Sequence, residues 1–130
     1  MIIAVFRKTE QAIYTFLNAG KEKGESLERY AWKVTVKEGM LEEYIRRHDN
    51  IWPEMTEMLT QAGIRDDTIW NVENELFDYY ECDSVEVASR ARSDSEINAK
   101  WDGYMKDVMG MERDPVTGAQ PLLKQVFLFE

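Results

Sequence analysis

The sequence predicts an α+β domain in which an antiparallel sheet carries helices on one face. Two spacings of apolar residues indicate this class: alternation, which is typical of strands, and a three-and-four spacing, which is typical of helices. Their order along the chain (strand, helix, two strands, helices, strand) is the third observation. With 130 residues, of which 44% are hydrophobic, the chain is long enough to bury a core.

A short N-terminal extension, 1–27, precedes the domain, 28–130. Residues 18–26 are polar and contain Lys, Glu and Gly, so they separate the two parts. The extension has too little apolar surface to fold on its own. Its first six residues are too few to form the apolar core of a signal peptide.

The domain begins with a strand over Tyr30–Lys37, in which every second residue is large and apolar. This alternation predicts one buried face, and Gly39 ends the strand. The inward residues are Tyr30, Trp32, Val34 and Val36.

An interrupted helix follows over residues 40–62, where apolar residues recur every three or four positions. Pro53 must break it, because proline lacks an N–H and disfavours helical geometry in the preceding residue. One helix that ends near Asp49 and a second over Pro53–Gln61 satisfy this constraint, and Gly63 is placed to cap the second. The apolar stripe consists of Leu41, Tyr44, Ile45, His48, Trp52, Met55, Leu59 and Ala62.

Two strands, Ile64–Val72 and Leu76–Cys82, follow and form a hairpin through a polar link, Glu73-Asn74-Glu75. Residues 85–92 fit a short helix. The polar residues before position 96 predict the start of another helix, and its N-cap is either Asp94 or Ser95. The inward residues of that helix are Ile97, Trp101, Tyr104, Met105, Val108 and Met109.

A loop, Gly110–Pro121, leads to a last predicted strand, Leu122–Glu130. The resulting βαββαβ order is that of the ferredoxin-like arrangement, a four-stranded antiparallel sheet with helices on one face. The other face of such a sheet must be covered. A second copy of the chain is the simplest cover, so we expect a homodimer.

The net charge of −9 argues against a nucleic-acid partner, because phosphate binding needs a basic surface. It also makes a small neutral ligand easier to accommodate than an anionic one. No apolar run approaches the ~20 residues of a membrane span, so we expect no membrane partner. The single cysteine, Cys82, excludes an internal disulfide and indicates the reducing cytoplasm.

His48 is the only histidine, and it lies on the apolar stripe. Imidazole gives and takes protons near neutral pH, and Tyr44 lies four residues earlier on the same helical face. The position near a helix end favours the charged imidazolium through the helix dipole. Spacing alone favours a buried histidine with a structural hydrogen bond.

The other candidate residues carry weaker signals. Most of the four tryptophans should form the core, but an aromatic ring can also stack on the apolar face of a sugar. One histidine and one cysteine cannot build a zinc site without several carboxylates, and no phosphate-binding glycine loop is present. We therefore expect neither a metal nor an organic cofactor.

The segment EEYIRRHDNIWPE, Glu42–Glu54, resembles the pattern EEYxxRHxxIWPE of the L-rhamnose mutarotase family. A second segment, Lys100–Met109, is similar to the WWxYMxDVM pattern of that family. Asp114-Pro115 and Gln125–Phe127 resemble its closing loop and strand. The resemblance covers about residues 30–130.

This resemblance implies a dimeric α/β barrel of two ferredoxin-like subunits that interconverts the anomers of L-rhamnose or a related 6-deoxy pyranose. It implies that His48 transfers the proton and that Tyr44 and Trp101 contact the sugar. Two sugar-contacting positions depart from the family. Asp102 stands in place of a second tryptophan, and Asp67 or Thr68 stands in place of a tyrosine, so Asp67 and Asp102 are candidate substrate contacts.

Ring opening needs one group to take the anomeric hydroxyl proton and another to protonate the ring oxygen. His48 can fill one role, and water, Tyr44 and Asp102 stay open for the other. Three other functions fit the same architecture. They are a cofactor-independent or haem-linked monooxygenase, a non-catalytic sugar-binding module, and an interaction domain in which His48 is structural.

Overall fold

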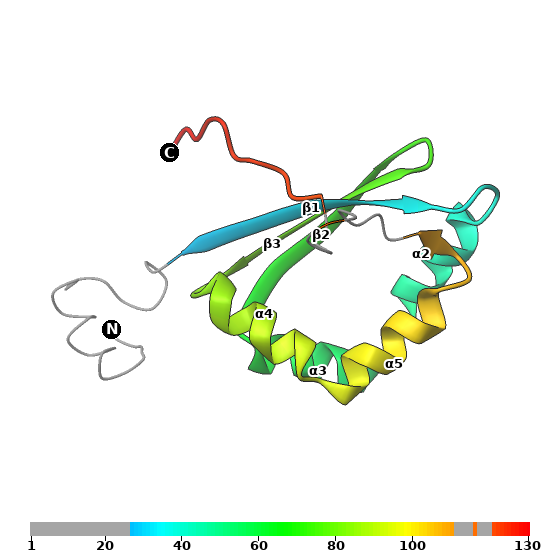
Figure 1. Ribbon diagram of the computed structural model, residues 1–130, viewed down its shortest axis with the longest axis horizontal. Coiled ribbons are helices and arrows are strands. Elements are labelled where there is room, and N and C mark those ends of the chain that lie inside the picture. The colour runs from blue at the N-terminus through cyan, green and yellow to red at the C-terminus, as the bar shows by residue number, and fades with distance from the viewer. Residues whose placement is uncertain (1–26, 111–115, 117–120) are drawn as a thin grey trace, which may run out of the picture.

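The computed structural model describes residues 27–110, 116 and 121–130, and its centre is a four-stranded antiparallel sheet (Figure 1). The strands lie in the order β2-β3-β1-β4, as in the ferredoxin-like arrangement, so the predicted fold class is confirmed. Residues 1–26 lie outside the described part, and the boundary at residue 28 stays a prediction. The strands are β1 (Glu28–Val36), β2 (Ile64–Val72), β3 (Glu75–Cys82) and β4 (Met109–Gly110).

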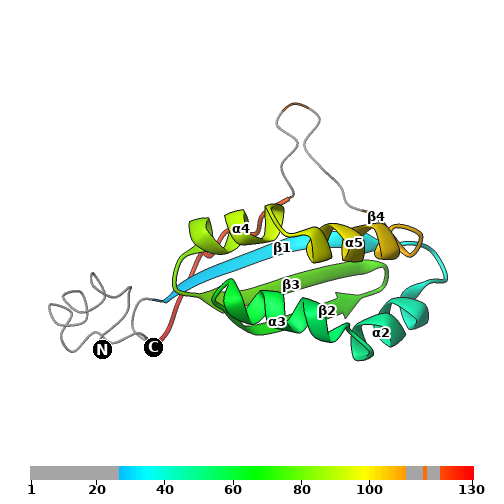
Figure 2. The same ribbon diagram turned by 90° about the horizontal axis from the view of Figure 1, so that it is seen from below.

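The helices of the described part all lie on one face of the sheet (Figures 1 and 2). Helix α4 packs against β1, and α3 packs against both β2 and α5. None of these helices is long and apolar enough to cross a membrane. Their bounds are α2 (Leu41–Asp49), α3 (Pro53–Gln61), α4 (Val85–Ser93) and α5 (Glu96–Met105).

The predicted bounds of α2, α3 and α4 and the start of α5 are confirmed to within a residue, but α5 ends at Met105, so Val108 and Met109 lie beyond the helix and Met109 begins β4. Trp52 is extended, with ψ 139°, directly before Pro53 at the start of α3. Gly63 ends α3 with φ +83°, a left-handed conformation that glycine adopts without steric cost. Of the two candidate caps for α5, Ser95 is the cap, because its hydroxyl accepts a hydrogen bond of 3.0 Å from the N–H of Asn98.

The core lies between the helix-covered face of the sheet and the helices. Val34 and Val36 of β1 and Leu76 of β3 are at most 3% exposed, as the alternation predicts. Burial of a side chain of this size contributes about 1.5–3 kcal/mol. Two predicted inward residues instead lie at the surface: Ile45 is 47% exposed and Tyr104 is 37% exposed. Tyr104 nevertheless packs against Trp52 and lies under the guanidinium of Arg47.

The predicted last strand, Leu122–Glu130, is wrong. The fourth strand is the short β4, which pairs with Thr35 and Val36. Only the start of the predicted segment runs beside β1: Leu122 bridges Trp32, and the N–H of Leu123 donates to the Ala31 carbonyl at 2.9 Å. Residues 124–130 contain a continuous apolar run, 126–129, but they pair with no strand in the part of the chain that the structure describes.

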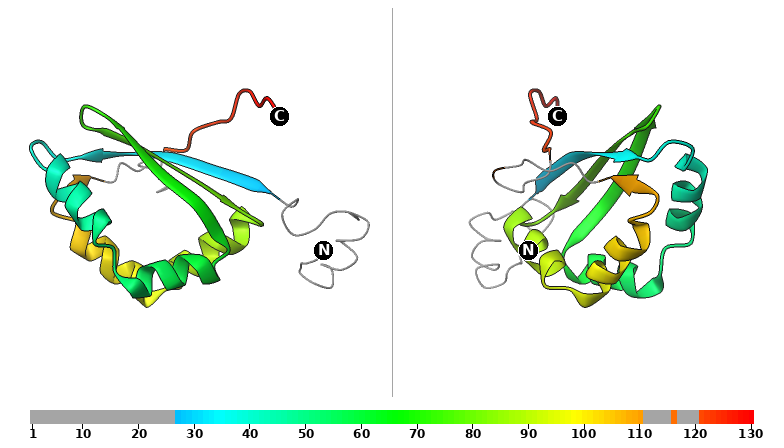
Figure 3. Two further views of the ribbon diagram at one scale, coloured as in Figure 1. Left: turned by 180° about the vertical axis from the view of Figure 1, so that it is seen from behind. Right: turned by 45° about the vertical axis from the view of Figure 1, so that its right-hand side comes forward.

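No helix of the described residues covers the other face of the sheet, which is called the bare face below (Figure 3). Trp70 and Val72 of β2 point to this side and are 67% and 53% exposed. Apolar residues of the C-terminal segment are also exposed, among them Val126, Phe127 and Phe129 at 78–86%. The molecule therefore presents apolar surface where the sequence predicts a subunit interface.

Candidate active site

His48 lies in the last turn of α2, with one ring face against Tyr44. The two ring centroids are 4.3 Å apart and the interplanar angle is 27°. Nδ1 of His48 lies 3.2 Å from the carbonyl oxygen of Tyr44. Because a carbonyl oxygen can only accept, Nδ1 carries the proton and donates it. Nε2 is then the unprotonated nitrogen that can act as a base.

Burial lowers the pKa of His48 below its ordinary value of 6.5, so the ring is neutral at neutral pH. The bond to the Tyr44 carbonyl and the charges of Asp67 and Asp49 act in the opposite direction, with smaller effect. The prediction that the helix end favours the imidazolium is therefore wrong, because desolvation outweighs the favourable electrostatics. The neutral ring is the form that a general base requires.

Trp101 closes the site from the side of α5. Its ring meets the edge of His48 at a centroid distance of 5.4 Å and an angle of 88°. Trp52, at the bend before Pro53, packs against Trp101 at 5.0 Å and 89°. Trp101 is only 6% exposed, so this packing holds its ring in one orientation.

A cavity of about 550 Å³ opens between the sheet and the helices, within the size range of small-molecule sites. Tyr44 and His48 line it from α2, and Trp101 and Asp102 line it from α5. A second cavity of about 240 Å³ shares His48 and Trp101 with the first and is also lined by Asp67. The five predicted site residues therefore line two adjacent cavities. Within the described residues, no three His, Cys, Asp or Glu side chains gather as a metal site.

A β-bulge decides which of Asp67 and Thr68 faces the cavities. The register between β2 and β3 shifts by one residue around Asp66, which has φ +52°. The shift places Asp67 on the helix-covered side of the sheet, beside Asp78 of β3. It turns Thr68 to the bare side, where its hydroxyl accepts a hydrogen bond of 3.0 Å from Trp70.

Asp78 is a candidate that the sequence analysis missed. It lines both cavities, and its carboxyl interacts closely with that of Asp67, which lines the smaller one. Burial, followed by the hydrogen bond and charge of Asp67, raises the pKa of Asp78 to about 9, while Arg92 acts in the opposite direction. The carboxyl is therefore protonated at neutral pH. A signal was present, since Asp78 occupies an inward position of a strand between Leu76 and Tyr80.

Asp102 lies at the exposed edge of the larger cavity and accepts a hydrogen bond of 3.4 Å from Asn98. Asn98 is a second residue that the sequence analysis missed. It lines the same cavity, it is 9% exposed, and its side-chain oxygen has no hydrogen-bond partner within the described part of the chain. A buried oxygen of this kind can accept a bond from a sugar hydroxyl.

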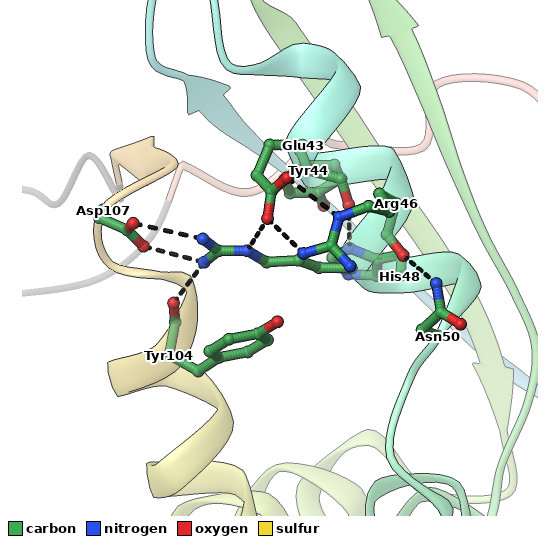
Figure 4. Close-up of polar contacts among 8 residues, drawn as sticks. Glu43, Tyr44, Arg46, His48, Asn50, Tyr104 and Asp107 are labelled. Atoms are coloured by element: carbon green, nitrogen blue, oxygen red, sulfur yellow. Dashed lines mark hydrogen bonds and ion pairs between the residues drawn. The ribbon is translucent and has the colours of Figure 1, made fainter.

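Another side of α2 is held by ion pairs and hydrogen bonds between side chains (Figure 4). Arg47 donates to Glu43 at 2.7 Å, to Asp107 at 2.9 Å and to the carbonyl oxygen of Tyr104 at 2.7 Å. Its guanidinium also lies 4.4 Å from the centre of the Tyr104 ring. Hydrogen bonds from Arg46 and Arg47 lower the pKa of Glu43 to about 2. This network ties α2 to α5 and so sets the distance between His48 and Trp101.

Comparison with known proteins identifies the family of the chain. The model of the L-rhamnose mutarotase family matches residues 29–129. The L-rhamnose mutarotase of Burkholderia ambifaria is 34% identical over 104 residues, which cover 78% of this chain and 99% of that protein. The L-rhamnose mutarotase of Tolumonas auensis is 41% identical over 88 residues, which cover 66% and 84%.

A solved structure agrees with the sequence relatives. The crystal structure of the L-rhamnose mutarotase from Formosa agariphila superposes with a TM-score of 0.65 at 29% identity. The match covers 79% of this chain and 99% of that one. From the family match, the relatives and the shared fold together, we conclude that this chain belongs to the L-rhamnose mutarotase family.

Proposed function

We propose that this chain interconverts the α and β anomers of L-rhamnose and that His48 is the residue that transfers the proton. The activity named for its relatives supports the reaction. One observation carries the role of His48: a neutral imidazole, with Nδ1 bonded to the Tyr44 carbonyl, lines a cavity large enough for a monosaccharide.

The reaction consists of ring opening, rotation of the C1 carbonyl and ring closure. On opening, Nε2 of His48 takes the proton of the anomeric hydroxyl while the C1–O5 bond breaks and O5 is protonated. Ring closure is the reverse of ring opening, with the other face of the C1 carbonyl turned towards O5. The acid and the base therefore exchange roles on closure. Proton transfer by a positioned side chain typically contributes 10²–10⁴-fold.

Four side chains are proposed as substrate contacts. The ring of Trp101 offers an apolar surface to the pyranose, and Tyr44 offers its hydroxyl. Asp67 and Asp102 are acceptors for sugar hydroxyls, one from each cavity. These groups can bind neutral hydroxyls, as a monosaccharide substrate requires.

The test is exchange NMR of α- and β-L-rhamnose at equilibrium. The parent protein should accelerate anomer exchange over buffer, and His48→Asn should lose about 10²–10⁴-fold of that acceleration. Asparagine can still donate to the Tyr44 carbonyl, so this variant removes the base and retains the hydrogen bond. Gln61→Ala, at the exposed end of α3, is the control and should retain the parent rate. A parent protein that exchanges the anomers no faster than buffer would disprove the proposed reaction.

We further propose that two copies of the chain cover each other's bare sheet faces. Trp70 and Val72, with the exposed apolar C-terminal segment, form the surface that such a contact would bury. Sedimentation equilibrium should give the mass of a dimer for the parent protein. Trp70→Glu should shift the equilibrium towards the monomer, and an unshifted monomeric parent would exclude this interface.

A further inference from the structure

We propose that Asp78, across the cavities from His48, is the second proton carrier of the reaction and that Asp67 is the residue that positions its proton. This inference rests on the proposed function, because it assigns the group that protonates the ring oxygen. Asp78 lies on β3, whereas His48 lies on α2. The two groups are thus supplied by different layers of the fold.

The placement of the two groups is the first support. His48 and Asp78 both line the larger cavity, and both also line the smaller one. A pyranose in the larger cavity would therefore lie between an imidazole on the helix side and a carboxyl on the sheet side. Trp101 lines both cavities as well, so the stacking surface belongs to the same space.

The contact between Asp78 and Asp67 is the second support. Two carboxyl groups form a hydrogen bond only if one of them carries a proton, since two carboxylates repel each other. The pair therefore holds one proton at neutral pH, and burial keeps it on Asp78. The bulge at Asp66 is what brings Asp67 to this position, so the pair depends on one extra residue in β2.

The surroundings of Oδ1 of Asp78 are the third support. This oxygen is fully buried and has no hydrogen-bond partner among the residues that the structure describes. An ionised carboxylate would be poorly stabilised there, so these surroundings favour the neutral, protonated carboxyl. The charged and titratable side chains that line these cavities around Asp78 are His48 and Tyr44 from α2, Asp67 from β2, Tyr30 from β1, Tyr80 from β3, Arg92 from α4, Asp102 from α5, and Lys106 directly after α5.

His48 and Asp78 together account for both protons that move in the reaction. On opening, Nε2 of His48 takes the O1 proton, the electron pair of the O1–H bond becomes the second bond of the C1=O1 carbonyl, and the C1–O5 pair moves to O5. Asp78 gives its proton to O5, which leaves an imidazolium at His48 and a carboxylate pair at Asp67 and Asp78. The positive charges of His48 and Arg92 then offset that pair. On closure, the O5 proton returns to Asp78 and the imidazolium proton passes to O1.

The decisive variant is Asp78→Asn, assayed by the same exchange NMR. The amide can donate to Asp67 as the protonated carboxyl does, but it cannot give up a proton to the ring oxygen. We expect a loss of about 10²-fold or more in the catalysed exchange rate, with the fold retained. Asp66→Asn is the matched control: it lies next to Asp67, it faces solvent, and asparagine accepts the same left-handed backbone. It should exchange the anomers at the parent rate.

The role of Asp67 is tested by the pH profile. The protonated form of Asp78 is the active one, so the parent rate should fall on the alkaline side. Asp67→Asn should move that alkaline limb to lower pH, because an amide donor stabilises the Asp78 carboxylate. A merely structural Asp67 would lower the rate at every pH and leave the limb in place.

A readout without substrate separates this inference from the proposed function. Carbon-13 NMR of labelled aspartate carboxyls should show one carboxyl that stays protonated through neutral pH and disappears in Asp78→Asn. An active parent with an unchanged Asp78→Asn variant, or an Asp78 that titrates in the ordinary acid range, overturns this inference alone. A parent that does not act on L-rhamnose overturns the proposed function and the catalytic role of Asp78 with it.

Discussion

Charged and polar groups are paired on one side of helix α2 and left partly unpaired on the other, although the residues concerned are neighbours in sequence. On one side Arg47 is surrounded by partners of opposite charge, Glu43 and Asp107. On the other side His48 lines a cavity together with Asp78, whose carboxyl is largely buried, and Asp67, which is exposed. The first set is fully compensated, whereas the second leaves a carboxyl oxygen without a partner within the described residues.

The directions of the pKa shifts express this difference. Around Arg47 the surroundings stabilise the charged forms. The pKa of Arg47 is raised and that of Asp107 is lowered, in each case mainly by the hydrogen bond between them. In the cavities burial stabilises the neutral forms, lowering the pKa of His48 and raising that of Asp78. Permanently charged groups hold helices together, while groups held near neutrality can exchange protons. Two consecutive residues of α2, Arg47 and His48, thus belong to a structural cluster and a chemical one.

The largest expected effect is on the acid side of the activity profile. The base form of His48 is needed, so the exchange rate should fall tenfold per pH unit below its pKa. Because burial lowers that pKa, the fall should begin below the ordinary value of 6.5. Arg47→Gln, on the other side of α2, should leave the limb at the same pH. An acid limb above 6.5, or one that persists in His48→Asn, would contradict the assignment.

The next effect concerns the free energy of unfolding when an aromatic ring is removed from the cavity side or from the Arg47 side of α2. Trp101→Ala removes a ring that is 6% exposed and packs on His48 and Trp52, so it should lower the free energy of unfolding by about 3–5 kcal/mol. Tyr104→Ala removes a ring at the Arg47 side that is 37% exposed, and its effect should be clearly smaller. Urea unfolding of the two variants measures the difference. Equal losses would mean that the cavity side is no better packed than the ionic side.

The third effect is a stability that depends on pH. Asp78 keeps its proton when folded to about pH 9 but ionises near its ordinary value of 3.8 when unfolded. Between these values the folded state binds more protons, so stability falls as pH rises, by at most about 1.4 kcal/mol per pH unit. Asp78→Asn removes this loss. Its melting temperature should exceed that of the parent, and the gain should be larger at pH 8 than at pH 5.

The smallest effect is expected from the ionic side. Arg47→Gln removes the charge that links Glu43 to Asp107 and should lower the urea midpoint slightly at low ionic strength. Added salt should reduce the difference from the parent, since Asp107 is largely exposed and is screened. A difference that grows with salt would show that the aliphatic stem of Arg47, rather than its charge, is what stabilises the helix pair.

Much of the fold could be predicted because its signals are local. Pro53 and Gly63 act through their own backbone geometry, so the bounds of α3 follow from them directly. The apolar stripe of α2 likewise predicted that His48 and Tyr44 share a face. The last strand could not be predicted, because residues 124–130 contain a continuous apolar run but pair with no strand within the described part of the chain. Pairing partners are not encoded in a local pattern.

The sequence by itself therefore determined the order of the elements, the inward position of His48 and the family to which the chain belongs. Tertiary structure alone decided that Asp67 rather than Thr68 faces the cavities, because a single bulge in β2 reverses the sides. It also decided the charge states of two residues. Burial lowers the pKa of His48 although the helix end favours its charged form, and burial raises the pKa of Asp78. Desolvation depends on everything packed around a group, and no stretch of sequence contains that information.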